Sequence, residues 1–591
     1  MARFEAIAAR SLQPRVACYL PAFMNVQNWR LTEVDESLVT QVSTQVGVRP
    51  VVARILVARG FVRPDAIARF LNPRLVDLRP PDGIHDLELA LNRLAKALAE
   101  RERIGVFGDY DVDGVTSAAV LASGFRLLGG DVVPRVASRH AGYGLPVAEI
   151  DRFAAEGCRL VVTGDCGTSD VDALLRAREL GIDVIIIDHH QVPSGEKLSY
   201  ALINPLQKED AFAFKGLASC GIAFYLIAAL RSRIGQSGLD VRQLLDLVAL
   251  GTIADLVPLL DENRILVSAG LKVLSARQRP GLRALMEISR VADGNVGADD
   301  VSFRLAPRLN AAGRLGDAQV ALDLLLAPDD AEATRLAAAL DDLNRERQRI
   351  QEHVWTEALQ ALAETEGLAE SPAIVLGAQG WHPGVVGIVA ARLVERFGKP
   401  TIVVGFEGEI GRGSARTVPG VNLYQVLSAC SDHLIRYGGH AAAAGVTLAP
   451  DRLIGFRTAF SKQVDLQRQA WPIPGVLVDG VVELSEVNLS LVEALNQLAP
   501  FGVSNREPTL AVPGLSVSES RTVGQGHLQL TLAGLGARGE AIAFNMADQD
   551  PGRGTRIDLI AVVDLDTYRG VRRVRLRAKH LLRIAESTPF G

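Results

Sequence analysis

Three aspartates at alternate positions stand directly after a short apolar run, in the stretch Gly108-Asp109-Tyr110-Asp111-Val112-Asp113-Gly114. The apolar run, Ile104–Phe107, is typical of a buried parallel strand, and helix-like sequence begins at Val115. Ligands of open α/β sheets bind beside the carboxyl ends of the strands. Carboxylates crowded at such a place repel one another unless a cation lies between them. The stretch therefore indicates a divalent-metal site, with a solvated acidic turn that caps a helix as the alternative.

Two further polar clusters follow apolar runs of the same kind. Asp165 comes shortly after the run Leu160–Val162. The triplet Asp188-His189-His190 comes directly after Val184–Ile187. Because neighbouring parallel strands end at one edge of their sheet, we expect these side chains to converge with the aspartates of the first stretch, although they are far apart in the sequence.

Asp255 is a further candidate ligand, because it ends a segment with apolar residues at helical spacing, Leu244–Ile253. Each of these residues has an ordinary explanation when taken alone: a carboxylate that stabilises a glycine turn, one core and one solvated histidine, or a polar residue before a loop. Together, carboxylates and imidazoles at three strand ends favour a metal. The five cysteines lie far apart without a Cys-X-X-Cys pair, so this donor set suits manganese or magnesium better than a structural zinc.

The ordered series of these motifs resembles the DHH phosphoesterase superfamily and, within it, the RecJ-type single-strand-specific DNA exonucleases. The resemblance runs from about Trp29 to the end of the chain. Beyond the metal motifs it covers six further segments, Gly142-Tyr143-Gly144-Leu145, Asn204-Pro205, Arg308–Arg314, Gly380–Gly384, Gly438-Gly439-His440 and Pro500-Phe501-Gly502. The Asp-His-His triplet alone is a weak signal, whereas the ordered series is specific.

The resemblance implies a hydrolase with one or two divalent cations. Two cations about 3.5–4 Å apart can stabilise both the attacking and the leaving oxygen of an in-line phosphoryl displacement. In the superfamily pattern Asp165 would bridge the two cations and Asp111 would hold one of them, while the remaining ligands would hold the other. The implied ligand set is Asp111, Asp113, Asp165, His189 and Asp255.

The resemblance also implies roles for neighbouring groups. His190 would face the scissile phosphate, and Asp109 and Asp188 would be supporting groups or weaker ligands; these three are the predicted catalytic residues. Many superfamily members have a histidine at the position of Phe107, so the first metal site is expected to be weaker or completed by water. The expected chemistry is hydrolysis by water that Mn²⁺ or Mg²⁺ activates, without a covalent enzyme intermediate.

The elements that must position these residues are readable from periodicity. Residues 31–103 predict helices, and residues 104–187 alternate apolar runs with helix-like segments, as parallel strands buried on both faces do. Ala331–Glu366 has apolar residues at helical spacing without an interior proline, which predicts one long connecting helix. Its charged run Asn344–Arg349 is either a solvated face or part of a strand-binding cleft.

Residues 367–460 predict a second α/β domain, with strands at Ala373–Leu376 and Thr401–Val404. The small-residue stretches Gly411–Thr417 and Gly438–His440 are interpreted as turns that let backbone amides approach phosphates. By resemblance this is the DHH-associated domain, and nucleic acid would lie between it and the first α/β domain. The predicted phosphate contacts, including a terminal 5′ phosphate, are Arg308, Asn310, Arg314, Ser414, Arg416 and His440.

Residues 461–591 predict an all-β domain, a small barrel of the oligonucleotide-binding (OB) type, from alternating apolar residues and turn signals. Every odd position from 573 to 579 is basic, so period-two alternation places four cations on one strand face: Arg573, Arg575, Arg577 and Lys579. This face either follows a nucleic-acid backbone or belongs to a solvated edge strand that is protected by charge.

The composition is that of a multidomain globular protein, with 591 residues, 48% hydrophobic and 22% charged residues, and a net charge of −5. A nucleic-acid ligand must then be held by local basic patches rather than by the overall charge. No secretory signal or membrane-spanning run is evident, which predicts a cytoplasmic protein. The predicted parts are an extension (1–30), a DHH domain with a helical lead-in (31–330), a connecting helix (331–366), the DHH-associated domain (367–460) and the barrel domain (461–591).

By resemblance, the chain is expected to be a 5′-to-3′ exonuclease that degrades single-stranded DNA to mononucleotides in recombination and repair. The resemblance further implies a monomer that binds 5′-phosphorylated strands and works beside a single-strand-binding protein and a helicase. Two alternatives stay open. A phosphodiesterase for cyclic dinucleotides, pyrophosphate or short RNA would need no strand-binding barrel, and a non-catalytic relative in a replication assembly would typically have lost metal ligands.

Overall fold

The computed structural model describes residues 29–584, except 140, 141, 143, 470–475, 525 and 567–571. The predicted extension (1–30) lies outside these residues up to residue 28, and its last two residues belong to a strand, β1 (Trp29–Leu31). Tyr143 of the Gly-Tyr-Gly-Leu segment also lies outside the described residues. The chain divides into two compact units. The first contains residues up to Ala68, Arg349–Ala499 and Glu507–Gly591, and the second contains Arg69–Gln348 with Pro500–Arg506.

The second unit is built on a five-stranded parallel sheet with the strand order β3-β2-β4-β5-β6. The apolar runs expected within residues 104–187 form four of these strands, which confirms the predicted parallel sheet. The last strand was not predicted, because three residues are too few to give a periodic pattern. The strands are β2 (Arg103–Gly108), β3 (Asp131–Val136), β4 (Leu160–Gly164), β5 (Asp183–Ile187) and β6 (Ala201–Ile203).

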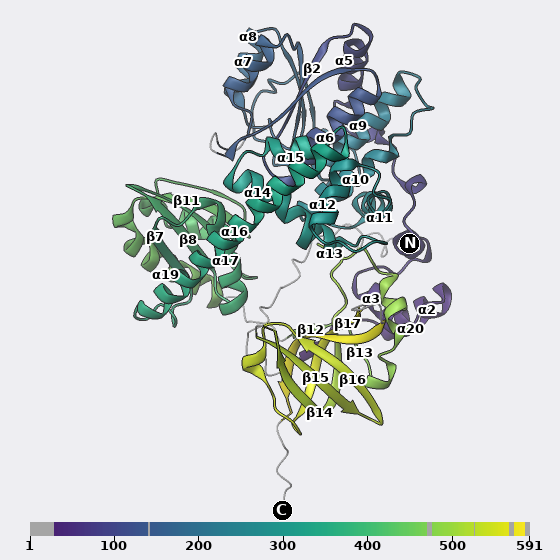
Figure 1. Ribbon diagram of the computed structural model, residues 1–591, viewed down its shortest axis with the longest axis vertical. Helices are drawn as coiled ribbons and strands as arrows, with labels where there is room; N and C mark the ends of the chain where they lie inside the picture. Colours follow the sequence, from purple (N-terminus) through teal and green to yellow (C-terminus); the bar gives the residue numbers. More distant parts are fainter. Residues whose placement is uncertain are drawn as a thin grey trace, which may run out of the picture. The chain divides into compact units, whose positions relative to one another are not determined.

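Helices cover both faces of this sheet, as Figure 1 shows. The core on one face includes residues of α5 (Leu87–Ala99), α6 (Val112–Leu127) and α9 (Ser219–Arg233). The core on the other face includes residues of α7 (Val147–Ala155) and α8 (Val171–Glu179). From β2 the chain passes to β3 on one side and then to β4 on the other. The carboxyl ends of β2 and β4 therefore form a topological switch point, where ligands of open α/β sheets bind.

A helical layer extends the same unit beyond the sheet. α10 (Leu245–Ala254) is buried, and a π-helical turn, η5 (Val301–Leu305), leads into α14 (Ala306–Leu315). The predicted connecting helix is confirmed as α16 (Asp330–Glu364), which is unbroken over 35 residues. The remaining helices of this layer are α11 (Asp261–Ser275), α12 (Pro280–Ile288), α13 (Ala298–Asp300) and α15 (Gln319–Leu325).

The first unit contains a second, mixed sheet with the order β10-β11-β9-β8-β7, in which only β7 and β8 are parallel. The second half of α16 and α17 (Pro383–Phe397) cover one face, and α18 (Leu423–Ser428) and α19 (Leu453–Gln469) cover the other. The predicted boundary at residue 460 falls inside α19. The strands are β7 (Ile374–Gln379), β8 (Thr401–Glu407), β9 (Ile410–Arg416), β10 (Arg436–Gly439) and β11 (Ala443–Leu448).

The interpretation of Gly411–Thr417 as a turn was wrong, because residues up to Arg416 form strand β9. Its glycines serve close packing inside the sheet. A Cβ atom on Gly413 would lie 2.8 Å from methyl groups of both Val404 and Val446. Gly438 and Gly439 likewise belong to strand β10, and only His440 follows it.

The C-terminal part of the first unit is a closed five-stranded barrel, since β14 pairs with β15 on one side and with β17 on the other. β18 lies between β16 and β17, so the alternative of a protected edge strand was wrong. The expectation of an all-β domain missed the helix α20 (Leu489–Asn496). The barrel strands are β14 (Leu510–Val523), β15 (His527–Gly534), β16 (Ala537–Ala543), β17 (Arg556–Asp566) and β18 (Arg573–Arg583).

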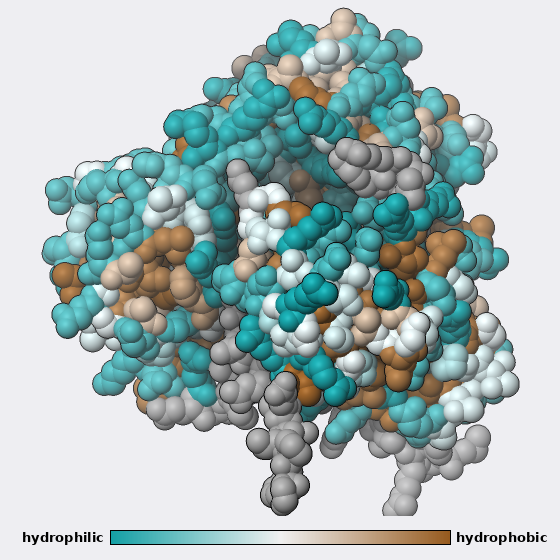
Figure 2. Space-filling model, turned by 60° about the horizontal axis from the view of Figure 1, so that its bottom comes forward, coloured by the Kyte–Doolittle hydropathy of each residue, from teal (hydrophilic) through white to brown (hydrophobic). Residues whose placement is uncertain are grey.

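The start of the described chain joins this barrel part. β1 (Trp29–Leu31) pairs with β12 (Val476–Val478), and β13 (Gly480–Val481) pairs with β14. Three helices follow β1, namely α2 (Glu36–Val46), α3 (Pro50–Ala58) and α4 (Pro64–Leu71). Figure 2 shows hydrophobic patches separated by hydrophilic side chains on one face of the molecule. Among the described residues, no helix combines the length and the apolar character needed to span a bilayer.

Candidate metal centre and active site

The acidic stretch after β2 is a tight turn that its two glycines make possible. A Cβ on Gly114 would lie 2.4 Å from the Asp109 nitrogen, and one on Gly108 would lie 2.2 Å from the Gly114 oxygen. The Asp111 carboxylate caps α6 by accepting a hydrogen bond of 3.1 Å from the Gly114 N–H. Asp109 and Asp113 are buried, so a solvated acidic turn does not describe the stretch.

Asp113 is held in place by the beginning of a distant helix. Its carboxylate accepts hydrogen bonds from the backbone N–H groups of Ser219 (2.7 Å) and Cys220 (3.0 Å), at the start of α9. The Ser219 hydroxyl in turn donates to Asp165 Oδ1 at 3.1 Å. The sequence analysis missed Ser219, because nothing in its local sequence marks it as a partner of residues 54 and 106 positions earlier.

Asp165 stands at the end of β4 with a left-handed backbone conformation (φ 66°). This conformation is uncommon outside glycine and asparagine, and such residues cluster at functional sites. The Thr163 hydroxyl holds the turn by donating to the Cys166 carbonyl at 2.7 Å. The side chain is thereby fixed at the switch point between β2 and β4.

Asp188 organises the two histidines that follow β5. Its Oδ1 accepts hydrogen bonds from the backbone N–H groups of His189 (2.8 Å) and His190 (3.1 Å), and from Nδ1 of His190 (2.8 Å). Its Oδ2 accepts one from the Thr168 hydroxyl at 2.5 Å. Burial alone would raise the pKa of Asp188, but these hydrogen bonds outweigh it and hold that pKa below its ordinary value. The ionised carboxylate therefore fixes the orientation of the His190 ring.

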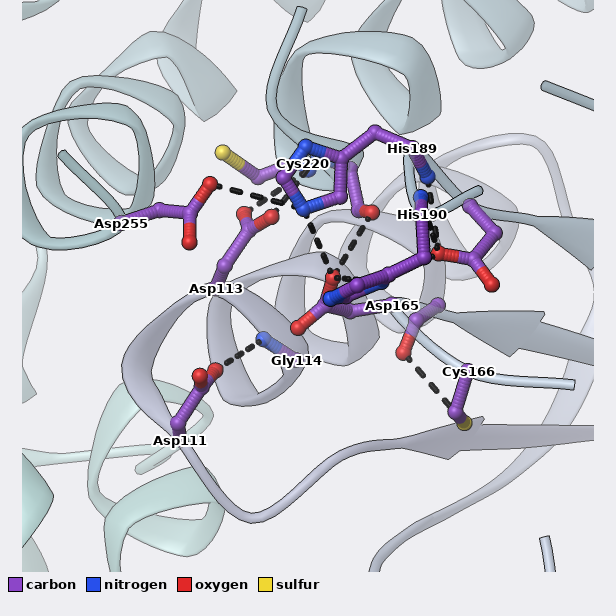
Figure 3. Close-up of polar contacts among 12 residues, drawn as sticks. Asp111, Asp113, Gly114, Asp165, Cys166, His189, His190, Cys220 and Asp255 are labelled. Carbon is purple, nitrogen blue, oxygen red and sulfur yellow. Dashed lines mark hydrogen bonds and ion pairs between the residues drawn. The ribbon is translucent and has the colours of Figure 1, made fainter. Parts of the chain in front are cut away.

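His189 lies between two carboxylates from different elements. Its Nε2 is 3.3 Å from Asp165 Oδ1 and 3.5 Å from Asp255 Oδ2, the latter at the C-terminal end of α10. Figure 3 shows these side chains, together with Asp113 and His190, directed toward one another. The convergence predicted from the strand ends is thus present in the fold.

Three overlapping groups of side chains have ligand atoms within 4.8 Å of one another. Asp165 belongs to two of the groups and His189 to two, so the groups form one continuous centre. Asp109 belongs to one group, beside Asp111 and Asp165, which favours its predicted alternative as a weaker ligand over a supporting position. The groups are Asp165–His189–His190, Asp113–His189–Asp255 and Asp109–Asp111–Asp165.

The crowded, buried carboxylates of this centre favour the binding of a cation. Burial, reinforced by neighbouring carboxylates, raises the pKa of Asp109 and of Asp255 to about 8. The same causes raise the pKa of Asp111 and, further, that of Asp165. Asp109 Oδ1, His189 Nε2 and Asp255 Oδ2 are buried atoms that have no hydrogen-bond partner among the residues the structure describes. Oxygen and imidazole donors left in this state fit a hard divalent cation such as Mn²⁺ or Mg²⁺.

A cavity of about 300 Å³ opens onto this centre. Its basic and amide groups come from Arg139, Asn310 and Arg314. The Arg139 guanidinium lies 4.3 Å from the centre of the Tyr110 ring and donates a 2.7 Å hydrogen bond to the Gly313 carbonyl. Arg139 could not be identified from the sequence, since a lone arginine after β3 carries no motif signal.

Two of the six predicted phosphate contacts line the cavity. Asn310 and Arg314 line the cavity, whereas Arg308 is engaged with Asp341 of α16 at 2.8 Å. In the first unit, Arg416 donates to the Ser414 hydroxyl at 2.8 Å, and burial lowers the pKa of its guanidinium. His440 is exposed at the end of β10.

The basic face of β18 is partly neutralised by acids of the same unit. Arg575 pairs with Asp566 of β17 at 2.9 Å, and Arg577 pairs with Glu507. Arg573 is exposed and Lys579 is half-buried. Arg575 and Arg577 thus already have carboxylate partners.

The parts of the chain match three family models in order. Residues 103–252 match "DHH family, N-terminal domain", residues 370–465 match "DHHA1 domain" and residues 478–580 match "RecJ OB domain". The single-stranded-DNA-specific exonuclease RecJ of Bacillus subtilis is 35% identical over 93% of this chain and 70% of its own length. RecJ of Dickeya dadantii is 37% identical over 89% of this chain and 95% of its own length.

The chain belongs to the RecJ family. A crystal structure of Thermus thermophilus RecJ in complex with Mn²⁺ matches with a TM-score of 0.80 and 31% identity, over 94% of this chain and 79% of that chain. A structure of the same protein with Mg²⁺ matches with a TM-score of 0.75 and 30% identity, over 95% and 79%. The expected DHH domain, DHH-associated domain and OB barrel are therefore confirmed as the architecture of a RecJ-family protein.

Metal binding to this centre should release protons. At pH 7 in the metal-free protein, carboxyl groups with pKa values near 8 hold protons that a cation must displace. The apparent affinity for Mn²⁺ should rise with pH up to about 8, and calorimetry in two buffers of different ionisation enthalpy should show net proton release at pH 7. Asp255→Asn should release fewer protons. Binding without proton release across this pH range would contradict the assignment.

Proposed function

We propose that this chain is a divalent-metal-dependent exonuclease that hydrolyses single-stranded DNA from the 5′ end and releases mononucleotides. The observation that carries the proposal is the buried carboxylate–imidazole centre at the switch point of a RecJ-family DHH domain. Manganese or magnesium would be held there by the five predicted ligands, joined by Asp109. A bound cation supplies charge that offsets the charge building on the phosphate oxygens and lowers the pKa of the attacking water.

The protein's own groups support a hydrolytic role for the cavity. Asp165 is proposed to contact both cation positions, because it belongs to two of the three ligand groups. His190, whose Nδ1 is bonded to Asp188, is proposed to donate from Nε2 to an oxygen of the scissile phosphate. Arg139 and Arg314 add two cations to the cavity, where they would bind further phosphate oxygens and align the strand for in-line attack.

The alternatives are less well supported. A non-catalytic relative is disfavoured because carboxylates and imidazoles at all the predicted ligand positions converge. A phosphodiesterase for small substrates is disfavoured by the RecJ OB domain, since a small substrate needs no strand-binding barrel. Full-length relatives named as single-stranded-DNA-specific exonucleases point the same way.

The finer features of the substrate complex remain predictions. Ser414, Arg416 and His440 are proposed to hold phosphates, one of them a terminal 5′ phosphate. Arg308 and the basic face of β18 are proposed to contact the strand less strongly, because Arg308 and two cations of that face have acidic partners. A cytoplasmic monomer that acts beside a helicase and a single-strand-binding protein is the corresponding cellular prediction.

The substrate and direction can be tested in one assay. The protein with Mn²⁺ is given 5′-phosphorylated single strands labelled at either end, the matching blunt duplex, and a cyclic dinucleotide. We expect mononucleotides to appear from the 5′ end of the single strand alone. Release that starts from the 3′ end would overturn the direction, and turnover of the cyclic dinucleotide alone would overturn the proposed substrate.

Asp165→Asn should abolish cleavage while leaving strand binding largely intact. Asparagine tolerates the left-handed backbone and matches the volume of aspartate. It lacks the negative charge with which Asp165 is proposed to bind both cation positions. We expect kcat to fall by about a thousandfold or more, with little change in the strand dissociation constant. Asp170→Asn is the matched control, because Asp170 is also a carboxylate with a raised pKa but accepts from Leu145 N–H outside the ligand groups. Near-normal kcat in Asp165→Asn would refute its role.

A further inference from the structure

Two large apolar side chains are exposed on segments that adjoin the cavity lining. Leu256 is 67% exposed and directly follows Asp255, which lines the cavity. Phe303 is 76% exposed in the π-helical turn η5, which leads into the helix that carries Asn310 and Arg314. Neither side chain contributes to the hydrophobic core of the unit.

Leu256 is held in an unfavourable state by its surroundings. Its backbone is left-handed (φ 61°), a conformation that a leucine rarely adopts. The chain on either side is fixed, since the Asp255 N–H bonds to the Gly251 carbonyl at 2.9 Å and the Leu259 N–H bonds to the Val503 carbonyl at 2.8 Å. An exposed, strained leucine next to a candidate ligand is the kind of residue found at substrate-binding sites.

Phe303 lies just before a helix face that leads into the cavity. Pro307, Asn310 and Arg314 are accessible positions of α14 with spacings of three and four residues, so they lie on one face of that helix, and Phe303 is exposed in the turn before it. Phe303 is about 10 Å from Asn310 along the helix axis. π-helical turns often occur at functional sites, where the extra residue changes which side chains line a face.

The segments next to these side chains are packed near the centre. η5, which carries Phe303, packs against α10, and Leu256 lies in the turn directly after α10. α14, which follows η5, lies against the acidic turn so closely that a Cβ on Gly313 would be 2.4 Å from the Tyr110 carbonyl oxygen. Leu256 and Phe303 therefore adjoin helices that pack around the centre.

We propose that Leu256 and Phe303 form a nucleobase-contacting subsite for the strand that enters the metal cavity. The inference rests on the proposed function, because it takes single-stranded DNA as the occupant. Phosphates would be held by the cation and by Arg139 and Arg314 inside the cavity, while the bases of the following nucleotides meet the apolar groups outside it. Phe303 stacks on one base, and Leu256 packs against the nucleoside nearer to the centre.

This subsite explains preference for single strands without preference for sequence. Every base has a face on which an aromatic ring can stack, so the contact tolerates any sequence. In a duplex the faces of the bases are already stacked on one another and are not available. The subsite would thus contribute to the choice of an unpaired strand beyond the charge contacts, which a duplex also offers.

The test is a double-mutant cycle, in which a side-chain substitution is combined with the removal of one base from the strand. Strands that carry one abasic nucleotide at each of the first six positions are compared with the intact strand, in the wild type, Phe303→Ala, Phe303→Trp and Leu256→Asn. Binding is measured in EDTA by fluorescence anisotropy, and KM and kcat are measured with Mn²⁺. Leu89→Ala, an exposed leucine of α5 away from the cavity lining, is the matched control.

In the wild type we expect an abasic nucleotide at the Phe303 contact to weaken binding and raise KM about tenfold, the size of a single base–aromatic stack, and one at the Leu256 contact, nearer to the cleaved end, to have a smaller effect. In Phe303→Ala the intact strand should show that weakening, and the same abasic position should add nothing. Phe303→Trp should restore wild-type behaviour. Leu256→Asn, which relieves the backbone strain, should lose the effect at a position nearer to the cleaved end, while Leu89→Ala should match the wild type.

Two results would overturn the subsite. One is that the losses from Phe303→Ala and from every abasic position add. The other is that Phe303→Ala binds the strand as tightly as the wild type does, which would mean that the side chain contacts protein and not DNA. A wild type that binds the strand but does not cut it would instead refute the proposed function, and the binding cycle in EDTA would still decide the subsite.

Discussion

Repulsion among buried carboxylates is the constraint on which the rest of the structure depends. Asp109, Asp113 and Asp165 are almost fully buried within one small region, and burial together with their neighbours raises the pKa values of Asp109 and Asp165. Such an arrangement is unfavourable without a counter-charge and gives no packing advantage in return. The fold accepts it because a divalent cation, once bound, turns the repulsion into binding energy and places concentrated positive charge where a phosphate can reach it.

The parallel sheet makes this arrangement possible by bringing strand ends together. β2, β4 and β5 are neighbours in the sheet, so their carboxyl ends deliver an acidic turn, a strained aspartate and a histidine pair to one edge. The helices complete the centre in two ways. α9 holds the Asp113 carboxylate through hydrogen bonds from its first backbone N–H groups, and α10 ends just before Asp255. The helix α14 then carries amide and guanidinium groups over the same cavity.

The candidate ligands could be predicted from the sequence because each follows an apolar run whose length and composition report a buried strand or helix. α16 was equally readable from its uninterrupted period. Features that depend on contacts between distant elements could not be predicted from the sequence. Examples are the hydrogen bond from the Ser219 hydroxyl to Asp165 and the stacking of Arg139 on Tyr110. The glycines of β9 were misread as a turn, since only the packed sheet shows that Val404 and Val446 leave no space for a side chain at Gly413.

This buried centre is expected to hold the cation used for hydrolysis, and anomalous diffraction from crystals soaked in Mn²⁺ would locate that cation. One or two anomalous peaks should be enclosed by the converging ligands, Asp109, Asp111, Asp113, Asp165, His189 and Asp255. Peaks only at other places, in crystals of protein that degrades single-stranded DNA with Mn²⁺, would contradict it.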